Sequence, residues 1–137
     1  DVHMSRGLGD VYKRQEKVVG NFSDTLAVSA GGTFTFDVSQ GSVVLGGITT
    51  TVTNWNFTNV NGQNGKATTV TLINNAGTGY TYGDACKVNG ASIANGVKWV
   101  GGNPPPSTNN DDILTFSIVR DNTGVTRVYC SSSINII

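Results

Sequence analysis

From residue 18 onward, apolar and polar residues alternate with a period of two along short segments. The clearest case is the segment 33–39 (TFTFDVS), in which Phe34, Phe36 and Val38 share one face. The segment 67–73 (ATTVTLI) alternates in the same way. This period is typical of a β-strand with one buried face, whereas no segment shows apolar residues at helical spacing over about ten residues. The pattern therefore predicts an all-β protein.

Turns rich in glycine and asparagine separate the expected strands. These strands lie at residues 33–39, 42–45, 49–60, 67–73, 80–88, 97–100, 112–120 and 125–131. Gly83 and Asp84 interrupt one of them and predict a β-bulge. The last two flank Asp-Asn-Thr-Gly and form the clearest hairpin. Roughly eight to ten strands at this spacing predict an antiparallel β-sandwich or jelly-roll-like domain, and no repeat of about 20–50 residues is evident.

The first 17 residues differ in composition from the rest of the chain. They hold seven charged residues, whereas the whole sequence has 9 Lys+Arg and 9 Asp+Glu. Such a break predicts a leader at residues 1–17 and a single domain at 18–137. The string SRGLGDVYKRQ, within residues 1–15, also resembles translated remnants of sequencing adapters. We therefore expect a non-native or disordered leader, with a natural charged tail as the alternative.

Composition then narrows the classes of function. The 137 residues suffice for one domain with a sizeable core, and the formal net charge is +0. Because there is no basic excess to release counterions from a polyanion, binding to nucleic acid is not expected. No apolar stretch approaches the roughly 20 residues of a spanning helix, so membrane insertion is not expected either.

The residues that usually carry catalysis are scarce. His3 is the only histidine and lies in the leader that we expect to be non-native, so the domain at 18–137 has no histidine for a Ser-His-Asp or Cys-His arrangement. Cys86 and Cys130 are expected to be two half-buried thiols, with a disulfide as the alternative in an oxidising compartment. No glycine-rich segment matches a phosphate loop. We therefore expect neither enzyme activity nor a cofactor.

The acidic residues after the leader are all aspartates. Most of them stand beside Gly, Asn, Ser or Thr, where turn and cap roles explain them. A glycosidase is an alternative, and it would need two carboxylates facing each other across a cleft. Calcium binding by Asp111, Asp112 and loop carbonyls is chemically allowed, but one Asp-Asp pair is too weak a signal to predict a metal site.

Aromatic and amide side chains are the candidates for contact with a ligand. Trp55 is expected in the core because of the alternation around it, whereas exposed aromatic rings would form a platform for a sugar. Two polar loops, 61–66 and 101–110, are candidate contact loops. The candidate ligand-contact residues are Trp99, Tyr80, Tyr82, Asn61, Asn64 and Asn103.

Several segments together carry a resemblance to a known family. In chain order they are ATTVTLI (67–73), the turn 77–80, GVKWVGGNP (96–104), DILTF (112–116) and RVY (127–129). From Thr49 to Asn135, nearly two-thirds of the chain resembles a domain common at the C-terminal ends of tail-fibre and other virion structural proteins of tailed phages, marine phages above all. The chain departs from the family at residues 82–86 and at Val128, where the family carries tryptophan.

The resemblance implies a virion structural protein without common catalytic residues. Such a protein is made in the host cytoplasm, assembles as a homotrimer with other virion tail proteins, and contacts a glycan or protein of the host surface. A chain with 13% charged residues fits this role, because its surface does not depend on ion pairs that salt screens. Edge strands such as 42–45 would then need cover from a neighbour.

A cellular carbohydrate-binding or adhesin module is the alternative function. It predicts that Trp55, Tyr82 and Trp99 are exposed and coplanar, so their burial discriminates between the two functions.

Overall fold

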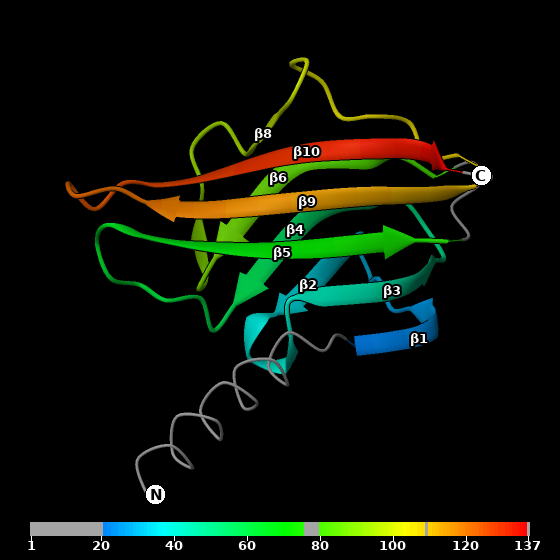
Figure 1. Ribbon diagram of the computed structural model, residues 1–137, viewed down its shortest axis with the longest axis horizontal. Helices are drawn as coiled ribbons and strands as arrows, with labels where there is room; N and C mark the ends of the chain where they lie inside the picture. The colour runs from blue at the N-terminus through cyan, green and yellow to red at the C-terminus, as the bar shows by residue number, and fades with distance from the viewer. Residues whose placement is uncertain (1–20, 76–79, 109, 137) are drawn as a thin grey trace, which may run out of the picture.

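The computed structural model describes residues 21–75, 80–108 and 110–136, with side chains from Leu26 onward. This part of the chain forms ten β-strands, a short 3₁₀ helix at Val38–Gln40 and no α-helix (Figure 1). The strands are β1 (Asn21–Leu26), β2 (Thr33–Asp37), β3 (Val43–Ile48), β4 (Val52–Thr58), β5 (Lys66–Asn74), β6 (Tyr82–Val88), β7 (Ala91–Ser92), β8 (Val97–Trp99), β9 (Asp111–Arg120) and β10 (Thr126–Ile136). The leader expected at residues 1–17, and most of the turn at 77–80, lie outside the described residues.

The strands form two sheets that pack face to face (Figure 1). The larger sheet has the order β1-β3-β5-β9-β10-β8, and the smaller has the order β2-β4-β6-β7. From β1 to β6 the chain alternates between the sheets, and each strand pairs in parallel with the strand two places earlier. The first six strands are therefore three turns of a flattened coil, onto which the antiparallel β9–β10 hairpin is added.

The all-β fold with two packed sheets is confirmed, but the pairing within each sheet is mixed rather than wholly antiparallel. Between β1 and β6 the glycine-rich turns do not fold a strand back onto its neighbour; they carry the chain across to the other sheet. Phe34 of β2 pairs with Trp55 of β4, 21 positions later, and Trp55 pairs with Cys86 of β6, 31 positions later. These unequal steps explain why no repeat is evident in the sequence.

Three local expectations can be compared with the strands. The hairpin is confirmed, because β9 and β10 pair antiparallel over most of their length. The bulge is also confirmed: Val52 pairs with Tyr82 but Asn54 pairs with Ala85, so β6 carries one extra residue around Gly83. The prediction that residues 42–45 form an edge strand is wrong, because the strand there, β3, lies between β1 and β5.

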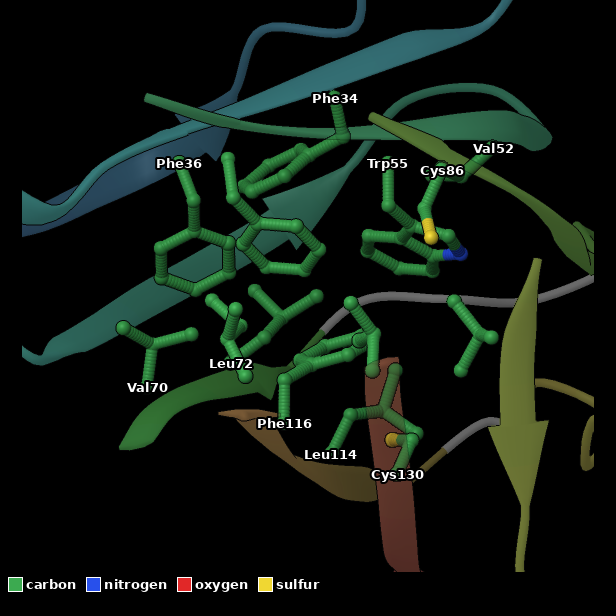
Figure 2. Close-up of a cluster of buried hydrophobic side chains, with 14 of the residues drawn as sticks. Phe34, Phe36, Val52, Trp55, Val70, Leu72, Cys86, Leu114, Phe116 and Cys130 are labelled. Atoms are coloured by element: carbon green, nitrogen blue, oxygen red, sulfur yellow. The ribbon is translucent and has the colours of Figure 1, made fainter. Parts of the chain in front are cut away.

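Aromatic rings fill the space between the sheets (Figure 2). Phe116 of β9, on the larger sheet, packs against Trp55 and Phe57 of β4 with ring centroids 4.9 and 5.2 Å apart. Phe36 of β2 stacks on Phe57 at 5.8 Å. The indole N–H of Trp55 donates to the Gly83 carbonyl over 2.8 Å, so this fully buried ring leaves no polar atom unpaired.

Both cysteines belong to this core. Cys86 of β6 and Cys130 of β10 come from different sheets and are free and buried, more deeply than the half-buried state expected from sequence (Figure 2). Burial raises the pKa of the Cys86 thiol to about 11 and that of the Cys130 thiol to about 12. Both side chains therefore act as small apolar core residues at neutral pH.

Candidate functional site

The two ends of the stack of strands differ. At the end that we call the open end, the sheet edges are β1 and β2, of 6 and 5 residues. Between them is a hollow of about 210 Å³, lined by Leu26, Phe34 and Val44 with Asp37 on its rim. No described strand pairs with the outer edge of β1 or of β2, and edge strands of this length offer a row of N–H and C=O groups to another strand.

At the opposite end, which we call the closed end, the edges are β7 and β8, of only 2 and 3 residues. The Trp99 indole of β8 donates to Asp84 of β6 over 2.8 Å and so connects the two sheets. Gly96 allows this close approach, because its φ is +63° and a Cβ there would lie 2.2 Å from the Asp84 carbonyl oxygen. β7 and β8 themselves present little backbone for pairing. β8 pairs with only residues 128–130 of the 11-residue β10, so among the described strands none covers the outer side of residues 131–136.

Asn89 makes two hydrogen bonds to the backbone of Val60, and we call this pair of bonds the asparagine bracket. Asn89, which follows β6 with a positive φ of 49°, accepts from the Val60 N–H over 3.0 Å and donates to the Val60 carbonyl over 2.8 Å. Asparagine suits this place because it tolerates positive φ and can bond the backbone with both ends of its amide. The loop after β4 is thereby fixed to the turn after β6.

A buried polar cluster lies where β5, β6 and β9 meet. The Asp112 carboxylate, which is fully buried, accepts from the Tyr82 hydroxyl (3.0 Å), the Thr108 N–H (2.9 Å) and hydroxyl (2.5 Å), and the Asn135 N–H (3.1 Å). Asn74 in turn donates to the Tyr82 hydroxyl over 2.9 Å. Burial raises the pKa of Tyr82. Four donors of the chain itself occupy acceptor positions of Asp112, which disfavours this carboxylate as a calcium ligand.

Two other aspartates organise turns, as the sequence predicts. Asp121 accepts from the Thr123 N–H and hydroxyl and from the Val125 N–H, and it pairs with Arg127 at 2.7 Å. Hydrogen bonds from Thr123 and Arg127 lower the pKa of Asp121.

Asp37 accepts from the Ser39 N–H and hydroxyl and from the Asn59 amide, which lowers its pKa. Across residues 21–75, 80–108 and 110–136, no group of three or more His, Cys, Asp or Glu side chains is placed to hold a metal.

The largest of three clefts lies beside the β9–β10 turn and has a volume of about 470 Å³. Its floor is aliphatic and comes from Val60, Val88 and Ile118, all nearly fully buried. Arg120, two residues beyond Ile118 on β9, is the one charged side chain among the described residues that line it. None of the three clefts is lined by two described carboxylates, which a glycosidase would require.

The aromatic candidates from the sequence belong mainly to the core. Tyr82 and Trp99 are 3% and 8% exposed and Trp55 is fully buried, so none of these rings offers a face to a sugar. Tyr80 is half-buried, and its carbonyl accepts from the Ser107 hydroxyl. The exposed, coplanar platform that the carbohydrate-binding alternative predicts is therefore not formed by these residues.

The amide candidates are on the surface. Asn61 lines the cleft, and Asn64 accepts from the Arg120 Nε over 2.8 Å, so the loop 61–66 borders this site. Asn103 is exposed in the segment after β8, which rises clear of the β9–β10 hairpin (Figure 1). Sequence reasoning missed Arg120, although its position on the apolar face of β9 was a signal.

Comparison of the chain with family models, with curated proteins and with solved structures finds no match. No helix in the described ranges is long and apolar enough to cross a membrane.

Proposed function

We propose that this chain is a virion structural protein, a tail-fibre-like domain that assembles as a homotrimer in the virion tail and contacts a glycan or protein of the host surface. The difference between the two ends of the stack carries this proposal. The open end offers β1 and β2 for assembly, whereas the closed end is blunted by β7, β8 and the bond from Trp99 to Asp84. One end therefore suits contact with other copies or tail proteins, and the rest remains available to the host.

Two different edges at one end are suited to a ring. Each copy has β1 as the edge of the larger sheet and β2 as the edge of the smaller one. If β1 of one copy pairs with β2 of the next, the interface is head-to-tail, and such an interface closes when the rotation between copies fits. Closure at three copies gives the homotrimer and covers both edges, which removes the risk of open-ended aggregation.

The outer face of the smaller sheet fits a display role. Thr35, Asn56 and Lys87 pair across β2, β4 and β6, and the Asn56 amide donates to the Thr35 hydroxyl over 3.4 Å. A surface built from hydroxyls and amides loses little stability when salt screens its charges. Among the described residues, Arg127 and Asp121 form the one ion pair.

Sedimentation velocity on the full 137-residue chain tests the assembly. We expect a trimer that becomes a monomer with Thr35→Lys, because an exposed lysine on an edge strand opposes pairing. Thr69→Lys is the matched control: Thr69 is also exposed but lies on the inner strand β5, so its trimer should persist. A wild-type monomer, or a Thr35→Lys trimer, would contradict the proposal.

The genes adjacent to the coding sequence test the setting independently. Tail or baseplate genes on either side support the virion role. Genes for cellular surface or carbohydrate metabolism would instead favour the adhesin alternative.

A further inference from the structure

Arg120 is the charged side chain of the cleft of about 470 Å³ beside the β9–β10 turn. Its Nε is held by Asn64, and none of the described carboxylates lies within 4.0 Å of its guanidinium. Arg127, by contrast, is neutralised by Asp121 on the same hairpin. A guanidinium that is oriented through Nε keeps its terminal N–H groups for a ligand, and such groups bind carboxylates through paired hydrogen bonds.

The floor of the cleft calls for an apolar group on the ligand. Val60, Val88 and Ile118 are branched aliphatic side chains, and no aromatic residue in the described part of the chain lines the cleft. Stacking of a sugar ring on an aromatic face is therefore absent from this site. A methyl group that leaves water for this aliphatic surface is instead favoured by the hydrophobic effect.

Small polar side chains complete the rim. Ser92, Thr126 and Asn61 line the cleft, and neither the Ser92 nor the Thr126 hydroxyl bonds another described residue. Hydroxyls and amides of this kind suit a ligand that has several hydroxyl groups. The cleft's volume of about 470 Å³ falls within the usual range for small-molecule sites, about 300–1,000 Å³.

From these three features we infer that the cleft binds an acidic sugar bearing an N-acetyl group. The carboxylate pairs with Arg120, the acetamido methyl contacts the more exposed aliphatic side chains Ile93 and Val125, and the sugar hydroxyls bond the rim. The inference deepens the host-contact role and rests on that proposed function only for the source of the sugar. The binding itself depends on residues of this chain alone.

NMR titration of the isotope-labelled full chain with the methyl glycoside of N-acetylneuraminic acid is the test. We expect saturable shifts of the Val60, Val88, Ile118 and Arg120 amides, with a dissociation constant on the order of 1 mM. N-acetylglucosamine lacks the carboxylate and glucuronic acid lacks the acetamide, so each should bind at least about tenfold more weakly.

Two variants that each lose one positive charge test whether Arg120 is the group that binds the carboxylate of the sugar. Arg120→Gln should weaken binding about tenfold or more, because it removes the charge-assisted bonds. Arg127→Gln, on the same hairpin but outside the cleft, should bind within about twofold of wild type. Arg120→Lys retains the charge without the fork and should fall between them.

Several results would overturn the inference. They are equal binding by Arg120→Gln and wild type, equal binding of N-acetylglucosamine, shifts confined to residues outside the cleft, and no saturable shift up to about 20 mM sugar, well above the expected dissociation constant. A chain that forms the trimer but ignores the sugar defeats this inference alone. A chain that binds the sugar as a monomer defeats the assembly role alone.

Discussion

The open and closed ends of this protein are stabilised by different interactions. At the open end Leu26, Phe34 and Val44 surround a hollow, and the backbone edges of β1 and β2 face outward. At the closed end side chains carry polar bonds between elements, from Trp99 to Asp84 and from Asn89 to Val60. The difference shows that one end carries longer edge strands than the other, and it is the basis on which we propose the open end as the assembly surface.

The largest effect is expected from the indole that closes the stack. Trp99→Ala removes a side chain that is 8% exposed, together with its bond to Asp84, and should lower the free energy of unfolding by about 3–5 kcal/mol. Val100→Ala is the neighbouring control, because Val100 is 75% exposed and should change stability by less than about 0.5 kcal/mol. Urea unfolding measures both. Equal losses for the two variants would mean that Trp99 does not hold the closed end.

A smaller effect is expected from the asparagine bracket. Asn89→Gly keeps a residue that accepts the positive φ but removes the two bonds to Val60, at a cost of about 1–2 kcal/mol. Asn95→Gly is matched to it, since Asn95 also has a positive φ but no side-chain bond among those between described residues. Its stability should stay within about 0.5 kcal/mol of wild type. Thermal or urea unfolding that ranks the two variants in reverse would contradict the bracket.

The smallest effect is expected on the loss of stability at low pH, to which one aspartate at the open end and one in the hairpin turn contribute. The folded-state pKa values of Asp37, at the open end, and Asp121, in the hairpin turn, both lie below the ordinary value. Each carboxylate therefore stabilises the fold above about pH 4 and loses that contribution as the pH falls through its lowered folded-state value. Melting temperatures measured between pH 7 and pH 2 should fall less steeply for Asp121→Asn than for wild type. Identical slopes would show that the turn contributes nothing to acid sensitivity.

Local structure was predictable from the sequence where the interacting residues are close along the chain. The β9–β10 hairpin follows from Asp-Asn-Thr-Gly between two alternating segments, and the bulge at Gly83 follows from a glycine inside a strand. The parallel coil did not follow, because its pairs join residues 21–31 positions apart through turns of unequal length. Pairing at such distances depends on which faces pack together and not on any local signal.

The alternation along β9 contained a signal for the two polar sites, the buried cluster and the cleft. Every second residue of β9 lies on the same face, namely Asp112, Leu114, Phe116, Ile118 and Arg120. This apolar face therefore begins and ends with a charged residue. Asp112 became the centre of the buried polar cluster, and Arg120 became the charge of the cleft. Which of the two would be enclosed depends on loops 61–66 and 101–108, whose folded positions the sequence does not specify.

Hydrogen exchange with mass spectrometry, performed on the assembled full chain and on the dissociated chain at high dilution, tests most directly whether assembly uses the open end. The amides of residues 21–37, which include β1 and β2, should exchange more slowly in the assembly, because their free N–H groups become paired. The amides of residues 91–99, which include β7 and β8, should exchange equally in both states. Protection that appears at 91–99 and is absent at 21–37 would show that the closed end is the assembly surface and would contradict the proposal.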